Sequence, residues 1–414
     1  MSPRGVPRRP DRPWRRFVLL LAVLLGLAGG APGTSLDPAV VLRGAGLSEV
    51  GGDGSAISVL STDSLASYRM PGGARRWSVR LAAGAQLLAA DGTRVVLGFD
   101  DGTNRAAAVL TGLDAATGAP AWRRTGYVPA VYGCACGDGV VVAEQYVPGG
   151  DQPATTALAG IDVRTGAVRW SLGTPPGGRR EVVREPGEPV RIAMLDAGGT
   201  LRLYRADTAA LVSAVDLQDP GPVEGLAISA DRLLVYRYGL RNIVAGTVFD
   251  LGTGRRLWQR TAEPYGERLW WCARALCARA NEGPILVLDP DTGRERWRLD
   301  GWTDLSAVTE RYLLATPSPP DGRHLVLDAA TGRVVRRIDG WEPAGDPAGT
   351  RLLVAGRGAA GTTLVARLDV ESGAVTALGQ AGRWSGPPEC FTTGALLLCR
   401  LDQGRIPVWR LPAA

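Results

Sequence analysis

A twelve-residue segment with the sequence LDPDTGRERWRL, at residues 288–299, recurs in degenerate copies along most of the chain. When the copies are aligned on the glycine of their Thr-Gly pair, they follow one another at intervals of about 40 residues, which is typical of repeat architectures. A period of this length constrains the fold more than any other feature of the sequence. The six clearer copies place the glycine at Gly118, Gly166, Gly254, Gly293, Gly332 and Gly373, and two weaker copies have Gly73 and Ala209 there.

Each copy has the pattern of a β-hairpin. In one copy, the apolar run Ile285–Leu288 leads to Asp289, and Gly293 follows four residues later. An aspartate side chain can accept hydrogen bonds from backbone groups two residues on, and glycine can adopt a positive φ without steric cost. This spacing therefore predicts a tight loop between two strands. Two further short strands are expected upstream, as at 86–90 and 94–98, and four short strands per period predict one blade of a β-propeller.

The pattern Asp-x-x-Thr-Gly-x-x-x-Trp resembles the repeat of the PQQ-like (quinoprotein-type) β-propeller family over residues 55–411. This family includes PQQ-dependent alcohol dehydrogenases, the lipoprotein scaffold of outer-membrane barrel assembly and many uncharacterised envelope proteins. The resemblance implies the fold but no cofactor, because propellers built from this repeat need not bind a quinone. Five copies keep the tryptophan, and three depart from it, so that less regular stacking between blades is expected there. The tryptophans are Trp77, Trp122, Trp170, Trp258 and Trp297, and the departures are Ser213, Arg336 and Ala377.

We therefore predict an all-β fold, a single β-propeller over residues 56–414, with eight blades of four antiparallel strands and seven blades as the alternative. The eighth blade is expected to combine strands from 56–81 and 385–411, which closes the ring and removes its free edge. Upstream, residues 36–55 are rich in Gly with scattered Pro and Asp and are predicted to be a linker. The other seven blades are predicted near 83–125, 126–173, 174–217, 218–261, 262–300, 301–339 and 340–380.

The N-terminal residues predict export. Residues 1–16 hold six Arg and one Asp and are expected to form a basic cytoplasmic tail. A hydrophobic helix at 17–35 follows, as a cleaved signal peptide or as a membrane anchor, so the propeller is expected to be extracytoplasmic and either tethered by this segment or secreted. The tail accounts for +5 of the net charge of +6, which leaves about +1 for the rest, and a nucleic-acid partner is not predicted.

Four of the six cysteines are predicted to form two disulfides. Cys390 and Cys399 flank a two-residue turn and would face each other across a hairpin. Cys272 and Cys277 likewise flank a tight turn, predicted at 274–275. Residues directly opposite each other in a hairpin have Cβ atoms close enough for a disulfide after a small adjustment.

The remaining two cysteines, Cys134 and Cys136, are too close in sequence to face each other across a hairpin. They form a strained bridge, remain two thiols or make a redox site, and the sequence leaves these alternatives open. A metal site is not predicted, because this pair has no matching cluster of His and Cys and the one histidine, His324, stands alone.

A second periodic feature is aromatic. Tyr127, Trp302 and Trp341 lie nine residues after a turn glycine, and Trp384 lies eleven residues after one. These positions fall in the connections that lead to the inner strand of the next blade. They are candidates for an aromatic binding rim at the mouth of the central channel, with packing between blades as the alternative. The repeat aspartates recur in the same turn and are expected to make structural hydrogen bonds.

These features favour a non-enzymatic, exported β-propeller that binds a partner protein or another component of the cell envelope, with no catalytic, cofactor or metal residues predicted. The first alternative is a quinoprotein dehydrogenase that uses PQQ and Ca²⁺, but the chain has only three Asn, lacks adjacent cysteines and is short for that class. The second alternative is a glycan-binding propeller that uses Trp302, Trp341 and Trp384.

Overall fold

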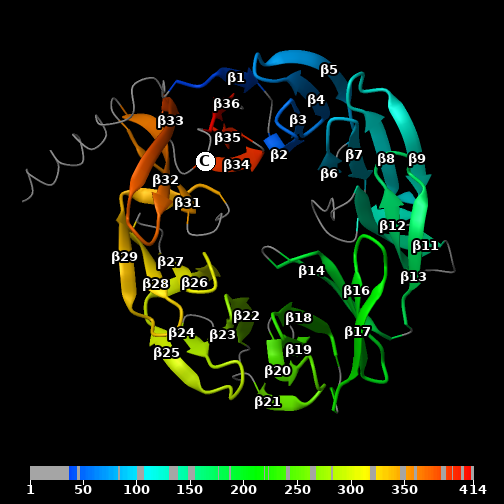
Figure 1. Ribbon diagram of the computed structural model, residues 1–414, viewed down its shortest axis with the longest axis vertical. Helices are drawn as coiled ribbons and strands as arrows, with labels where there is room; N and C mark the ends of the chain where they lie inside the picture. Colours follow the sequence, from blue (N-terminus) through cyan, green and yellow to red (C-terminus); the bar gives the residue numbers. More distant parts are fainter. Residues whose placement is uncertain are drawn as a thin grey trace, which may run out of the picture.

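The architecture is that of a ring of four-stranded β-sheets, seen in a computed structural model (Figure 1). Within the described part of the chain, 36 β-strands form and no α-helix does. The described residues are 37–43, 47–82, 84–99, 107–129, 139–147, 154–175, 177–185, 188–218, 220–221, 223–238, 243–261, 267–280, 283–317, 323–345, 351–358, 361–383, 388–393, 395–401 and 405–411.

The strands follow the chain as consecutive antiparallel neighbours, and each blade runs from an inner strand near the ring axis to an outer strand at the periphery. Blade 1 comprises β2 (Leu47–Gly52), β3 (Ala56–Ser61), β4 (Ser64–Arg69) and β5 (Ala74–Arg80). Blade 2 comprises β6 (Ala85–Ala90), β7 (Arg94–Phe99), β8 (Val109–Asp114) and β9 (Pro120–Thr125). Blade 3 comprises β10 (Tyr127–Pro129), β11 (Val140–Val147), β12 (Ala154–Asp162) and β13 (Val168–Gly173).

The next three blades repeat this order. Blade 4 comprises β14 (Arg179–Val183), β15 (Arg191–Leu195), β16 (Thr200–Arg205) and β17 (Leu211–Asp216). Blade 5 comprises β18 (Gly225–Ser229), β19 (Arg232–Tyr238), β20 (Ile243–Asp250) and β21 (Arg256–Thr261). Blade 6 comprises β22 (Arg268–Cys272), β23 (Ala275–Arg279), β24 (Ile285–Leu288) and β25 (Glu295–Leu299).

The last blades complete the ring, and one of them takes a strand from the start of the described chain. Blade 7 comprises β26 (Trp302–Ala307), β27 (Tyr312–Pro317), β28 (Arg323–Asp328) and β29 (Val334–Asp339). Blade 8 comprises β30 (Trp341–Pro343), β31 (Arg351–Arg357), β32 (Thr362–Asp369) and β33 (Val375–Arg383). Blade 9 comprises β34 (Glu389–Thr393), β35 (Leu396–Arg400), β36 (Arg405–Arg410) and, as its outer strand, β1 (Val40–Arg43).

The hydrophobic core is divided among the blade interfaces. Nine apolar clusters each contain buried residues of two neighbouring blades, including one cluster between blades 9 and 1. Large apolar side chains on both faces of the middle strands make this possible; for example, all six residues of β3 are buried. Each blade is therefore stabilised by its two neighbours, as expected for a repeat architecture.

The all-β propeller of four-stranded antiparallel blades is confirmed, with one blade more than the eight predicted. The seven predicted repeats between 83 and 380 correspond to blades 2 to 8. The difference lies at the N-terminal end, where residues 47–80 form a complete blade of their own instead of sharing one with 385–411.

The predicted linker at 36–55 is wrong for the same reason, because it contains β1 and β2. Val40 to Arg43 pair antiparallel with Val408 to Arg405, so the ring is closed by the start of the described chain joined to its end. No described segment forms a helix of the length and hydropathy needed to cross a membrane. The predicted tail at 1–16 and the predicted hydrophobic helix at 17–35 lie outside the described residues.

Candidate functional site

The repeat aspartates hold the turns that join the two outer strands of a blade. In blade 6, the carboxylate of Asp289 accepts hydrogen bonds from the backbone N–H and the hydroxyl of Thr292, each at 2.9 Å. The N–H of Gly293 donates to the backbone carbonyl of Asp289 at 2.8 Å. The expected structural role of these carboxylates is thus confirmed. Corresponding turns form around Asp114, Asp162, Asp250, Asp328 and Asp369.

These hydrogen bonds lower the pKa of the turn carboxyl groups. At Asp114 and Asp250, the largest cause is the hydrogen bond from the hydroxyl of the turn threonine. At Asp289, partial burial raises the pKa, but hydrogen bonds from Arg296 and Thr292 lower it by more. The charged form of each aspartate is therefore the form that the turn stabilises.

The repeat tryptophans connect each blade to the turn of the next one. The ring of Trp258 lies against Gly293, where an added Cβ would be 2.7 Å from the ring atom Cδ2, and its indole N–H donates to the carbonyl of Pro290 at 2.8 Å. Two separate features favour glycine at position 293: its φ is +67°, and the ring of Trp258 leaves no room for a side chain. The same arrangement joins Trp77 to Gly118, Trp122 to Gly166 and Trp297 to Gly332.

At one of the three departures from the repeat, an arginine takes the place of the tryptophan. A Cβ at Gly373 would lie 2.6 Å from Cζ of Arg336, and the guanidinium donates to the carbonyl of Glu371 at 2.9 Å. The guanidinium group, like the indole ring that it replaces, is flat and carries N–H donors. The less regular stacking predicted at this interface is therefore not observed.

At Ser213 the departure changes the interface. The turn glycine of blade 5, Gly254, packs against the backbone of the preceding outer strand, and an added Cβ would lie 2.0 Å from the carbonyl oxygen of Asp216. The N–H of Gln218 donates to the carbonyl of Gly254 at 3.0 Å. Main-chain contact thus replaces the ring, and the expected irregularity is confirmed here.

Both predicted disulfides form. Cys390 and Cys399 lie directly opposite each other in the hairpin of β34 and β35, as predicted. Cys272 and Cys277 are also bonded, but Cys272 lies opposite Ala275, so this turn begins one residue earlier than predicted and the bond is diagonal. Each disulfide joins the two inner strands of its blade within the buried core. Cys134 and Cys136, whose state the sequence left open, lie outside the described residues.

Three of the four candidate rim residues are described by the structure, and each of them packs between blades. Tyr127 is 9% exposed and belongs to the core cluster between blades 2 and 3. Trp302 and Trp341 are half-buried and pack against the clusters between blades 6 and 7 and between blades 7 and 8. Trp384 lies outside the described residues. The packing alternative therefore accounts for the three aromatic residues that are described.

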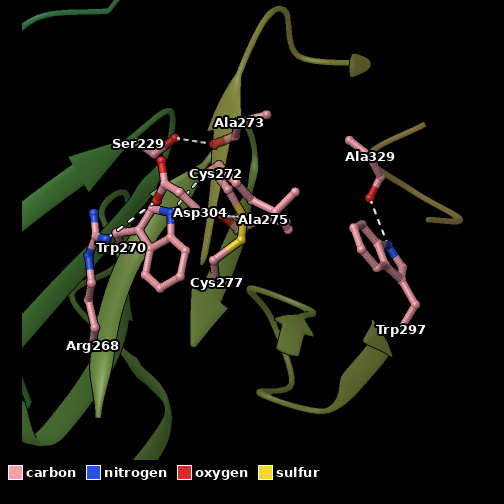
Figure 2. The surroundings of a disulfide bond; sticks show 11 residues. Ser229, Arg268, Trp270, Cys272, Ala273, Ala275, Cys277, Trp297, Asp304 and Ala329 are labelled. Atoms are coloured by element: carbon pink, nitrogen blue, oxygen red, sulfur yellow. Dashed lines mark hydrogen bonds and ion pairs between the residues drawn. A yellow bond between two sulfur atoms is a disulfide. The ribbon is translucent and has the colours of Figure 1, made fainter. Parts of the chain in front are cut away.

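Two tryptophans of β22 join blade 6 to its neighbours on both sides. The indole N–H of Trp270 donates to a backbone carbonyl of blade 7 at 2.9 Å, and that of Trp271 donates to one of blade 5 at 3.1 Å. Figure 2 shows Arg268 and Asp304 beside Trp270, near the disulfide of blade 6. The guanidinium of Arg268 lies over the Trp270 ring, 4.6 Å from its centroid, and 3.4 Å from the Asp304 carboxylate. These polar side chains are paired with one another.

The histidine is also part of an interface. His324, on β28, is 2% exposed, and its Nε2 lies 2.6 Å from the carboxylate of Glu342 on β30, which links blades 7 and 8. Among the described residues, no group of three or more His, Cys, Asp and Glu side chains is placed to hold a metal ion.

An apolar cleft of about 460 Å³ opens between blades 1 and 2. This volume is in the range of about 300–1,000 Å³ that is usual for ligand sites. Arg80 and Arg123 lie at the cleft and make no ion pair or side-chain hydrogen bond with any described residue. The cleft can therefore take an apolar group that carries a negative charge. Its apolar lining includes Val79, Leu81, Leu97, Phe99, Val109 and Leu113.

Comparison with known families decides which kind of propeller this is. Residues 30–234 match the family model described as "Outer membrane protein assembly factor BamB". The match begins before blade 1 and reaches into blade 5, and the repeat that carries it continues to blade 8. The chain is a PQQ-like β-propeller. No curated protein matches the sequence of this propeller.

Solved structures similar to this PQQ-like propeller include BamB from Moraxella catarrhalis, with 16% identity, 90% of this chain and 99% of that chain covered, and a TM-score of 0.44. The C-terminal WD40 domain of Sif2 has 11% identity, covers 91% of this chain and 98% of its own, and has a TM-score of 0.42. The computationally designed protein Ika8 has 14% identity, covers 92% of this chain and 100% of its own, and has a TM-score of 0.40.

The cleft of this PQQ-like propeller was missed by sequence reasoning. Its signal is weak, because Val79 and Leu81 simply continue an apolar alternation that starts at Trp77 within the outer strand β5. Only the spacing between blades 1 and 2 makes these side chains into a lining.

Proposed function

We propose that this PQQ-like propeller is a non-enzymatic scaffold that binds a protein partner on the extracytoplasmic side of the cell envelope. The single observation that supports this proposal is the match of residues 30–234 to the BamB family, whose name describes an assembly factor for outer-membrane proteins. A membrane tether through residues 17–35 belongs to the proposal as a prediction from the sequence.

The geometry suggests where the partner binds. The signature residues of the repeat are engaged in turns and blade contacts, so they hold the ring and leave binding to other surfaces. The cleft between blades 1 and 2 lies inside the region of the family match. We propose that apolar side chains of the partner enter this cleft and that an acidic group of the partner pairs with Arg80 and Arg123.

The test compares a cleft variant with a charge-matched control. The cleft variant carries Arg80→Glu and Arg123→Glu, and the control carries Arg294→Glu and Arg333→Glu, two exposed arginines in the turns of blades 6 and 7. Envelope proteins retained on each purified chain are quantified by mass spectrometry. We expect one protein to be retained by the wild type and the control, and at least about tenfold less by the cleft variant. Equal retention by all three would remove the cleft from the proposal, and no specific retention would remove the scaffold function.

The quinoprotein alternative has a separate test. PQQ and Ca²⁺ are titrated into the purified chain with its disulfides formed, and tryptophan fluorescence is followed. We expect no saturable quenching, because a scaffold needs no quinone. Saturable quenching at low PQQ concentration would overturn the non-enzymatic proposal in favour of a dehydrogenase, and reduction of an electron acceptor would then be measured.

A further inference from the structure

Every blade of the ring presents an outer strand whose free edge carries unpaired backbone groups. Natural sheet proteins protect such edges with charged side chains or proline, because an unprotected edge is a template for pairing with another strand. In this ring, eight of the nine outer strands contain at least one Arg, and β9 also begins with Pro120. The exception is β17, with the sequence LVSAVD, which has no Arg, Lys or Pro.

The same strand exposes the most apolar surface. Leu211 is 56% exposed and Val212 is 53% exposed, the two highest values among the large apolar side chains of the described residues, and the next is Val41 at 45%. Ser213 pairs with Leu203 and Leu211 pairs with Tyr204, so Val212 is the extra residue of a β-bulge, and the two exposed apolar residues stand together at this break in the pairing. Adjacent exposed apolar residues at a free edge mark an interaction site more strongly than scattered ones do.

The cause lies in the repeat copy of blade 4, which departs from the pattern at several positions. In blades 1, 2, 3, 5 and 6 the repeat tryptophan packs onto the next blade, but in blade 4 Ser213 has no ring to contribute. Gly254 of blade 5 contacts the backbone of Asp216, so β17 packs against the next blade at its C-terminal end. The first four residues of β17, Leu211 to Ala214, are all exposed. Loss of the tryptophan thus coincides with an outer strand that has no Arg, Lys or Pro.

We propose that the edge of β17 binds an extended segment of a partner protein by strand addition. Backbone hydrogen bonds would supply affinity, and apolar side chains of the segment would pack beside Leu211 and Val212. This inference rests on the proposed function, since it assumes a protein partner, but it uses a surface on blade 4 that is separate from the cleft.

The charges beside the strand indicate the chemistry of the segment. Asp216 accepts a hydrogen bond from the hydroxyl of Thr200 at 2.7 Å and makes no ion pair with any described residue. The nearby arginines Arg202 and Arg205 are already paired with carboxylates of their own blade. Arg202 also interacts electrostatically with Asp216, but the two arginines face three carboxylates, Asp196, Asp207 and Asp216, so one negative charge remains in excess. This excess favours a segment that combines apolar residues with a basic one.

The size of the edge favours such a segment over a second copy of the chain. β17 has six residues, and pairing two of these strands would bury far less than the roughly 1,200–2,000 Å² of a stable protein interface. A flexible peptide needs less area, because backbone hydrogen bonds along the strand provide much of the contact. Dimerisation through β17 is nevertheless an outcome that the test can detect.

The test measures binding of a labelled, end-capped peptide, RVTVTV, to the full chain by fluorescence anisotropy. A second peptide has the same side chains but N-methyl groups at alternate residues, which removes backbone donors along one edge. The chain variant Val212→Arg protects the edge, and Val168→Arg is its control, because Val168 is 40% exposed on β13, which already carries Arg169. Circular dichroism verifies that both variants fold.

We expect the unmodified peptide to bind the wild type and Val168→Arg alike, and at least about tenfold more weakly to Val212→Arg. The N-methylated peptide should lose binding to the same degree. The proposal is overturned if the wild type shows no binding up to about 1 mM peptide, if both peptides bind equally, or if both variants behave alike. It is also overturned if light scattering shows a dimer of the wild type that Val212→Arg dissociates.

This experiment and the envelope test can fail separately. The peptide assay needs no natural partner, and the envelope test needs no strand addition. Retention of a partner in the envelope test together with a failed peptide assay would leave the scaffold function in place and remove only β17. Failure of the envelope test with specific peptide binding would remove the cell-envelope partner and keep the edge as a peptide site.

Discussion

Two neighbouring interfaces of the ring derive from the same repeat and are held together differently. Between blades 5 and 6, Trp258 lies against Gly293 and donates to a backbone carbonyl of the turn. Between blades 4 and 5, Ser213 stands at the tryptophan position, and Gly254 meets the backbone of the preceding strand instead. The first interface depends on a side chain, whereas the second depends on the main chain and leaves most of β17 exposed.

The two interfaces show that the turn depends on local sequence, whereas the contact between blades does not. Asp250 and Asp289 make the same hydrogen bonds within their turns, although only one of the two turns receives a tryptophan. The turn is therefore determined by its own five residues, and the contact between blades is determined by the preceding blade. Arg336 shows what that contact requires, namely a flat group with an N–H donor.

The largest effect should come from acid, because it acts on all the turns at once, with or without a tryptophan. The pKa of the turn carboxyls is lowered in the folded ring, and the pKa of Asp207, paired with Arg205 in blade 4, falls to about 2. A carboxyl with a lowered pKa stabilises the fold above its unfolded pKa of about 3.9, and this stabilisation is lost as pH falls through the folded value. We expect the melting temperature to be level above about pH 5 and to fall steeply between about pH 4 and 2. Thermal unfolding followed by circular dichroism measures this, and a level profile down to pH 2 would contradict it.

The next largest effect should come from Gly293→Val at the regular interface. The valine would adopt a positive φ and its Cβ would overlap the ring of Trp258, so we expect a loss of about 2–5 kcal/mol in the free energy of unfolding. The control is Gly301→Val, where φ is +77° and nothing lies within 4 Å of the added Cβ. The control should lose only the backbone cost of about 1–2 kcal/mol, as measured by urea unfolding. Equal losses would show that the ring contact is unimportant.

A smaller loss is expected for Trp258→Ala. The substitution removes a half-buried ring and leaves the carbonyl of Pro290 without its donor, so we expect about 2–3 kcal/mol by urea unfolding. Trp258→Phe keeps most of the ring and removes only the hydrogen bond, and should lose about 1 kcal/mol. If Trp258→Ala cost no more than Trp258→Phe, the stabilisation would lie in the hydrogen bond alone.

The smallest effect is expected for Ser213→Trp, which restores the repeat residue at the irregular interface. The place beneath Gly254 is already taken by the backbone of Asp216, so the new ring should stay at the surface and change the free energy of unfolding by less than about 1 kcal/mol. Stabilisation by more than this would show that the strand can move to admit the ring. The two interfaces would then differ only in sequence.

Local features were predictable to a large extent. The Asp-to-Gly turns follow from side-chain and glycine chemistry within five residues, and the pairing of Cys390 with Cys399 follows from the length of one hairpin. The turn of the shorter hairpin at Cys272 was predicted one residue too late. Ala273 adopts a positive φ in this turn, and a glycine at that position would have indicated this conformation in the sequence, but an alanine does not. The cleft was not predicted, because it depends on side chains of two blades that converge only in the folded ring.

The amino-acid sequence by itself determined a repeated four-stranded unit, the turns within it and both hairpin disulfides, because these depend on residues a few positions apart. Only the tertiary structure decided how many units close the ring and which strand completes it. β1 pairs with β36, more than 360 residues away, and no local pattern near Val40 distinguishes a strand that joins another blade from a linker. The tertiary structure also brings each of the five repeat tryptophans to a backbone carbonyl of the next blade, and it does so for Trp170 although Ala209 replaces the turn glycine there.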